Sequence, residues 1–128
     1  MAVVVDTNIV SYIFKEDSRA ADYERHLIQV PKFISFMSLA ELRRWEHQSN
    51  WGPAKSEKFE KLLSDFGVIY ADSEMCDIWA RTTNDCSKKG RPIAVADAWV
   101  ASVALMFDIP LVTHNRKHFD HISGLSVL

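Results

Sequence analysis

The chain has 128 residues, of which 48% are hydrophobic and 25% are charged, with four glycines and four prolines. This length is typical of one domain, so we expect residues 1–128 to share one core and we exclude a two-lobed enzyme. The composition also excludes disordered and fibrous proteins. Fifteen Lys and Arg against 17 Asp and Glu give a formal charge of −2. Any nucleic-acid partner must therefore be held by a local basic patch.

Two features of the sequence concern the cellular compartment. Cys76 and Cys86 are too few and too far apart for a zinc site of the paired-cysteine kind, and they favour a reducing cytosol. The opening residues MAVVVDTNIV lack a basic segment followed by a long apolar stretch, and no apolar run reaches the ~18 residues that a membrane span needs. We therefore expect a cytoplasmic protein without a membrane partner.

Hydrophobic patterning along the chain predicts strands that alternate with amphipathic helices. The β-branched run that opens the sequence lacks polar alternation, which is typical of a strand covered on both faces. The segment SLAE at 38–41 has the capping-box spacing and predicts the start of a helix. In chain order, the expected strands are 2–6, 33–36, 67–71, 109–113 and 125–128, and the expected helices are 7–15, 18–29, 38–49, 54–65, 73–88 and 97–107.

Strands separated by helices indicate parallel β-α-β units, because parallel neighbours need long crossover connections. The expected fold class is therefore α/β, a three-layer α/β/α sandwich with a short, mainly parallel sheet. Such sheets bind their ligands at the carboxyl ends of the strands.

Three acidic residues are expected at that edge of the sheet. Asp6 closes the first strand, Glu41 follows the second, and Asp97 opens the helix before the fourth. Each has a purely structural interpretation: Asp6 as a turn or cap residue, Glu41 as the capping-box partner of Ser38, and Asp97 as a helix N-cap. Three converging carboxylates repel one another, however, and would bind a hard divalent cation such as Mg²⁺ or Mn²⁺.

The segment after the fourth strand supplies more of the predicted rim. Thr113 and Asn115 are further candidate catalytic residues, and the Asn115 side-chain carbonyl could hold a metal-bound water. His114, His118 and His121 could suggest a zinc face, but surface or RNA-contacting histidines fit their basic surroundings better. Basic and polar residues that flank the acids are candidates for binding an anionic substrate. They are Asn8, Arg43, Arg44, Lys88, Lys89, Arg91, Arg116 and Lys117.

Four segments in this order resemble a known family: VVVDTNIV, SLAEL, DAWVASVAL and PLVTHNRKHF. Together they resemble a PIN domain, and most closely the VapC toxins, the ribonuclease halves of bacterial type II toxin–antitoxin pairs. The resemblance spans essentially the whole chain. It implies a Mg²⁺- or Mn²⁺-dependent endoribonuclease that inhibits translation or growth, is commonly a homodimer, and is held inactive by a small VapB-type antitoxin.

The resemblance also assigns residues. Asp6, Glu41 and Asp97 match the metal-binding acids of the family, and Thr113 and Asn115 match its T-x-N segment. Many members have a fourth acid in that segment, where Asn115 is neutral; Asp120 could replace it only if the turn brought it back. Three carboxylates carry about −3, against about +4 for two divalent ions. We therefore expect one firmly bound ion and a second that arrives with the substrate phosphate.

Other classes remain as alternatives. A haloacid-dehalogenase-type phosphotransferase needs a second Asp where Asn8 stands, and a receiver domain needs an acidic pair after the first strand. Neither has a use for Glu41. The stronger alternative is a catalytically impaired PIN-like module that only binds RNA or protein, with Asn115 as a sign of decay.

Overall fold

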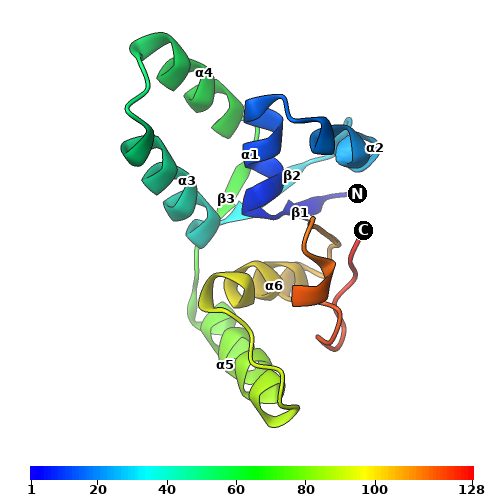
Figure 1. Ribbon diagram of the computed structural model, residues 1–128. Coiled ribbons are helices and arrows are strands. Elements are labelled where there is room, and N and C mark those ends of the chain that lie inside the picture. Colours follow the sequence, from blue (N-terminus) through cyan, green and yellow to red (C-terminus); the bar gives the residue numbers. More distant parts are fainter.

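A parallel sheet of four strands in the order β3-β2-β1-β4 separates two layers of helices in the computed structural model, which describes residues 1–128 (Figure 1). The expected α/β sandwich is therefore confirmed. The strands are β1 (Val3–Val5), β2 (Lys32–Ser35), β3 (Gly67–Ile69) and β4 (Leu111–Val112). The helices are α1 (Thr7–Lys15), α2 (Glu24–Leu27), α3 (Phe36–Ser49), α4 (Pro53–Leu63), α5 (Ser73–Lys88) and α6 (Val95–Phe107), with 3-10 turns η1 (Ser18–Tyr23) and η2 (Arg116–His118).

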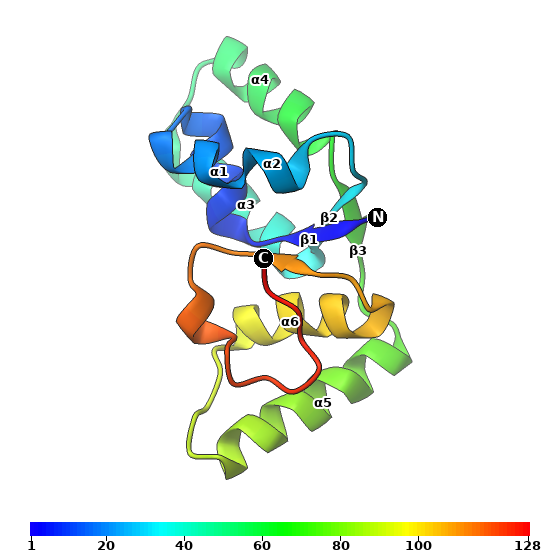
Figure 2. The same ribbon diagram turned by 90° about the vertical axis from the view of Figure 1, so that its right-hand side faces the viewer.

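The two faces of the sheet support separate cores because successive side chains of a strand point to opposite faces. Val3 and Val5 of β1 belong to a cluster with residues of α1, α3 and α4, including Phe59. Val4 belongs to a second cluster with residues of α5 and α6, including Val100. Figure 2 shows α1, α2 and α4 above the sheet and α5 and α6 below it. None of the helices has the length and apolarity to cross a membrane.

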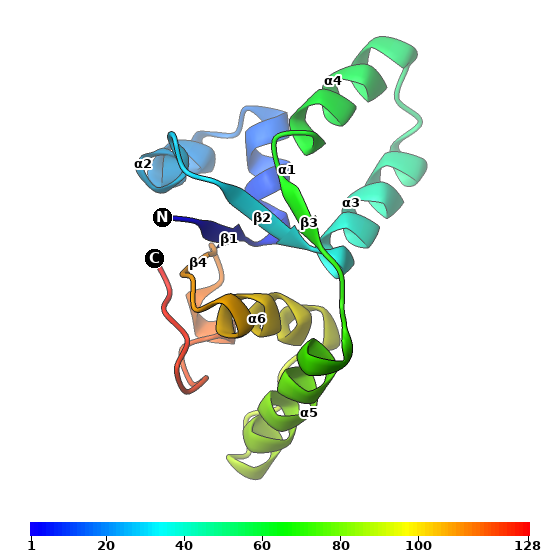
Figure 3. The same cartoon turned by 180° about the vertical axis from the view of Figure 1, so that it is seen from behind.

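The order in which strands are added to the sheet reverses its direction at β1. The chain passes from β1 to β2 and β3 on one side, and later returns to place β4 on the other side. Val4 pairs with Phe33 of β2 and with Leu111 of β4, and these two strand pairings and that of β2 with β3 are parallel. The chain termini lie near the amino ends of the strands, away from the start of α1 (Figures 1 and 3). In open α/β sheets the crevice at such a switch point, at the carboxyl ends, is where ligands bind.

Helix α3 begins two residues earlier than the sequence predicts. Its N-cap is Ser35, whose Oγ accepts a hydrogen bond from the Ser38 amide at 3.0 Å. The capping-box interpretation of Ser38 and Glu41 is therefore wrong. Ser35 ends the strand in an extended conformation and its short side chain captures the amide, so the strand passes directly into the helix.

Other predicted elements differ at their ends. The expected helix at 18–29 consists of η1 and the short α2, and Gln29 follows at a positive φ of 57°. The expected strand at 125–128 makes only one bridge, from Val127 to Leu111. Helix α6 begins at Val95 with Ala94 as its N-cap, so the N-cap interpretation of Asp97 is wrong.

Replacing Ser35 by alanine should destabilise the fold. The buried Ser38 amide would lose its acceptor, so the free energy of unfolding should fall by about 1–2 kcal/mol. Urea denaturation followed by circular dichroism measures this change. Ser87→Ala, at an exposed position near the end of α5, is the control and should change stability little. Equal stability of Ser35→Ala and the wild type would contradict this account of the α3 start.

Candidate active site

Asp6 lies at the switch point, directly after β1. Its side chain is buried, and both carboxylate oxygens accept hydrogen bonds. Oδ1 accepts from the Thr7 amide at 2.8 Å, which makes Asp6 the N-cap of α1, and Oδ2 accepts from the Thr113 hydroxyl at 2.7 Å. Thr113 is itself buried and follows β4 directly. The carboxylate therefore joins the ends of two neighbouring strands to the start of a helix.

Thr113 is held in turn by the segment that follows it. Its Oγ1 accepts a hydrogen bond from the Asn115 amide at 3.0 Å while its own proton goes to Asp6. This contact fixes the turn after β4 through the backbone of Asn115. The side chain of Asn115 makes no hydrogen bond within the chain and is half-buried, so its amide oxygen is available to a ligand.

Glu41 reaches the same region from α3. Its Oε1 lies 2.8 Å from the Thr7 hydroxyl, which also lies 2.8 Å from Ser38 Oγ. Thr7 follows Asp6 in the chain, so its amide contacts one carboxylate and its hydroxyl contacts another. The sequence suggested Ser38 as a capping-box residue and Thr7 as the start of a helix, and it gave no indication of these contacts. The missed signal is that both carry hydroxyl groups at the amino ends of helices that start from neighbouring strands.

Asp97 is the third residue of α6, and its Oδ2 lies 3.0 Å from Nδ1 of His118 in η2. A carboxylate in the first turn is favoured by the helix dipole. The imidazole partner comes from the turn that also fixes Thr113, so the two sides of the site are connected. The sequence suggested His118 as a surface or RNA-contacting residue and gave no indication of this pairing.

The carboxylates influence one another electrostatically. Burial raises the pKa of Asp6 above its ordinary value, and the hydrogen bond from Thr113 opposes that rise. The negative charge of Asp97, and to a smaller extent that of Glu41, raises the pKa of Asp6 further. A cation between these groups would relieve the repulsion, and carboxylate oxygens are the donors that Mg²⁺ and Mn²⁺ prefer.

The three acids do not form a closed ligand set in this structure. No group of three or more His, Cys, Asp or Glu side chains is arranged so that it could hold a metal ion. Glu41 is turned to Thr7 and Asp97 to His118, which accounts for the open arrangement. The donor chemistry of the three carboxylates nevertheless fits a hard divalent cation. The metal-ligand assignment of the three acids remains a prediction.

The basic candidate residues fall into paired and free groups. Arg43 contacts Glu60 and Glu46, so its charge is compensated within the helical layer. Arg91 pairs with Asp120 at 3.1 Å. Asp120 thus contacts Arg91 and makes no hydrogen bond with Asp6, Glu41 or Asp97. Four candidates are exposed and make no side-chain hydrogen bond within the chain: Asn8, Arg44, Lys88 and Lys117. The other two donate to backbone carbonyls, Lys89 to that of His121 and Arg116 to that of Val127.

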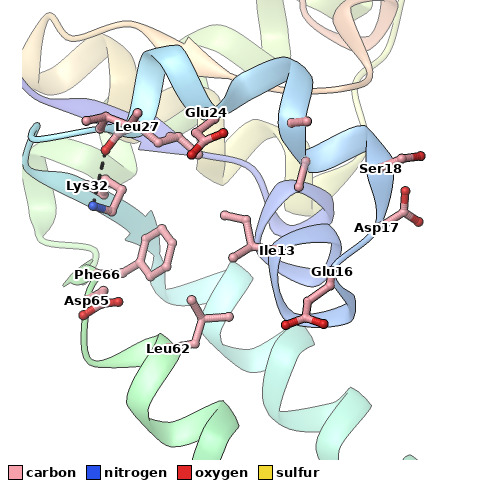
Figure 4. A pocket seen from close by; sticks show the side chains of 13 residues that line it. Ile13, Glu16, Asp17, Ser18, Glu24, Leu27, Lys32, Leu62, Asp65 and Phe66 are labelled. Carbon is pink, nitrogen blue, oxygen red and sulfur yellow. Dashed lines mark hydrogen bonds between the residues drawn. The ribbon is translucent and has the colours of Figure 1, made fainter.

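A cavity of about 500 Å³ lies elsewhere, between the η1–α2 segment and the end of α4 (Figure 4). Its floor is apolar, with Ile13 and Leu62 among the lining side chains. Its polar lining consists mainly of acids: Glu16, Asp17, Glu24 and Asp65, with Lys32 as the one cation. Such a lining repels phosphate, so this cavity is not suited to RNA.

Comparison with known proteins gives the class of this molecule. The family model of the PIN domain matches residues 3–125. Ribonuclease VapC1 of Haemophilus influenzae strain R2866 is 31% identical over 127 residues, which cover 98% of this chain and 95% of that protein. The tRNA(fMet)-specific endonuclease VapC of Shigella flexneri is 24% identical over 122 residues, covering 95% of this chain and 92% of that protein.

Solved structures agree with this assignment. VapBC2 from Rickettsia felis, bound to a DNA fragment from its promoter, matches with a TM-score of 0.86 and 26% identity over 100% of this chain and 98% of the other. VapBC-1 from nontypeable Haemophilus influenzae matches with a TM-score of 0.84 and 30% identity over 100% and 97%.

The fold is thus that of a PIN domain. The chain belongs to the PIN domain family, among the VapC ribonucleases.

Removing the charge of Glu41 should stabilise the protein in the absence of divalent ions. Glu41 raises the free energy of the ionised Asp6 carboxylate, so Glu41→Gln in EDTA at pH 8 should raise the melting temperature by about 1–2 °C. The gain should disappear as the pH falls through the raised pKa of Asp6, because the protonated carboxyl is not repelled. Calorimetric melting curves test this, with the exposed Glu57→Gln as control. A loss of stability for Glu41→Gln would contradict the repulsion.

Proposed function

We propose that this chain, as a single PIN-like nuclease domain of residues 1–128, is the endoribonuclease toxin of a VapBC-type toxin–antitoxin pair. The observation that carries the proposal is the buried Asp6 carboxylate at the switch point, with the charges of Asp97 and Glu41 close enough to raise its pKa. Similarity to VapC ribonucleases over nearly the whole chain supports the same activity. The reaction is hydrolysis of RNA phosphodiester bonds.

Asp6, Glu41 and Asp97 would hold Mg²⁺ or Mn²⁺, which when bound activates water and offsets charge on the phosphate. The chain's own groups prepare that site. Thr113 and the Thr7 amide fix the Asp6 carboxylate, so that its orientation does not depend on the ligand. Asn115 offers a neutral amide oxygen beside them.

The formal charge of −2 describes a protein whose acidic site repels RNA until a cation binds. Free basic residues near the rim, such as Lys117 and Arg44, would then attract the phosphate backbone. The domain is small, so we propose that a second copy of the chain enlarges the RNA-binding surface. A VapB-type antitoxin would keep the enzyme inactive, and both act in the cytoplasm, where the RNA is found.

The alternative is a PIN-like module that binds RNA or protein without cleaving it. It accounts for the neutral Asn115. It gives no reason for placing two further acids, Asp97 and Glu41, where their charges destabilise the ionised Asp6 carboxylate. The ribonuclease is therefore the better-supported function.

Asp6→Asn should abolish RNA cleavage and the growth arrest that accompanies expression. Loss of an inner-sphere carboxylate should lower cleavage by more than about 100-fold, since even the outer shell of a metal site contributes 10–100-fold. Cleavage of total RNA by purified protein in Mg²⁺ or Mn²⁺ measures the effect. Asp65→Asn, an exposed acid of the large cavity, is the control and should cleave normally. Growth arrest that survives Asp6→Asn would refute the nuclease assignment.

The number of bound ions can be tested separately by calorimetry with Mn²⁺. The free protein should bind one ion firmly, and a second should bind when a non-cleavable RNA is present, because its phosphate supplies the missing negative charge. Asn115→Asp should allow a second ion in the free protein. Two equivalent tight sites in the wild-type protein without RNA would contradict the single-ion prediction.

A further inference from the structure

A second cavity, of about 320 Å³, opens beside Asp97 at the amino end of α6. Arg91, Lys117, His118 and His121 contribute to its lining, and Asp97 is the one carboxylate there. The lining has the opposite character from the acidic cavity of Figure 4. It therefore suits an anion, and it shares a wall with the proposed metal site.

His121 lacks a partner in the wall of this cavity. Its side chain is only 9% exposed, and neither ring nitrogen has a hydrogen-bond partner. The nearest acid oxygen, Oδ1 of Asp120, lies 3.6 Å from Nδ1 and already accepts from Arg91 at 3.1 Å. An imidazole always carries at least one N–H group, and a buried N–H without an acceptor is costly. Both nitrogens are enclosed in this structure, so the ring would donate to a ligand in the cavity after turning toward it.

The start of α6 adds backbone donors to the same wall. Ala94, which lines the cavity, is the N-cap and makes no side-chain hydrogen bond. The Ala98 amide donates a hydrogen bond to the Ala94 carbonyl, and it is the first amide of α6 that has a backbone acceptor. The amides of residues 95–97 have no acceptor within the chain. Free amides and the positive end of the helix dipole together form an anion-binding arrangement.

The two cations of the cavity differ in how they are held. The guanidinium of Arg91 bridges Asp120 and the Lys117 carbonyl, which fixes its position. The ammonium of Lys117 has no ion pair or hydrogen bond within the chain, so its charge is available to a ligand. A phosphate in this cavity would thus meet one free cation, one positioned cation, an unpaired imidazole and free amides.

We propose that this cavity binds a phosphate of the RNA strand that neighbours the scissile phosphate. His121, Lys117 and the start of α6 would be substrate-binding groups that place the strand relative to the carboxylates, with no part in the bond cleavage itself. The proposal rests on the ribonuclease function, because it takes RNA as the ligand. The first test measures phosphate binding without RNA cleavage, so the phosphate site and the ribonuclease function can fail independently.

That first test uses inorganic phosphate and the purified protein in EDTA, followed by nuclear magnetic resonance of the histidine rings. The His121 resonances should shift and saturate with phosphate. Lys117→Ala should weaken the affinity about tenfold, a change that one lost charged contact can produce. Lys61→Ala, an exposed cation on α4, should leave it unchanged. Absent shifts at His121, or equal effects of the two lysine variants, would overturn the subsite whatever the activity of the protein.

The second test uses RNA oligonucleotides that the wild-type protein cleaves, with one neutral methylphosphonate placed in each flanking linkage in turn. At one linkage, the methylphosphonate should raise KM of the wild type with little change in kcat. At the same linkage, it should cause little further loss of affinity in Lys117→Ala. The salt dependence of binding should fall in slope by about 0.7 for that variant. His121→Gln, which keeps a donor, should retain more affinity than His121→Leu of equal stability. If the methylphosphonate and the Lys117→Ala substitution lowered the affinity additively at every linkage, the proposal would be contradicted.

Discussion

The packing of this molecule around its candidate site depends on one buried carboxylate, that of Asp6. Asp6 is 5% exposed, yet its carboxylate sits among apolar strands because the Thr7 amide at the start of α1 and the Thr113 hydroxyl after β4 supply its two hydrogen bonds. The same contacts align the carboxyl ends of β1 and β4 and cap α1. Breaking any of them leaves an uncompensated buried charge, so the site and the stability of the sheet depend on one arrangement.

The position of this carboxylate could be predicted from the sequence because its causes are local. A continuous run of valines is typical of a strand buried on both faces, and an acid that ends such a strand lies at the edge of the sheet. Alternation of strands and helices then fixes parallel pairing and places Glu41 and Asp97 near the same edge. These inferences use the order of residues and need no knowledge of side-chain contacts.

The partners of each acid could not be predicted in this way. Glu41 has the spacing of a capping box, but Ser35 takes the capping role because the strand ends there, and Glu41 is left free to reach Thr7. Asp97 contacts the imidazole of His118, which lies in η2 beyond β4. Contacts between distant segments depend on the packed geometry, which hydrophobic periodicity does not encode.

The bond between Asp6 and Thr113 joins residues 107 positions apart, at nearly opposite ends of the chain. Contacts of such long range form only after the intervening loop has been closed, and they are slow to form. During translation, a ribosome that has not yet synthesised β4 therefore carries a nascent chain whose first carboxylate has no hydroxyl partner. For a protein that degrades RNA, this delays assembly of the site until nearly the whole chain has been synthesised.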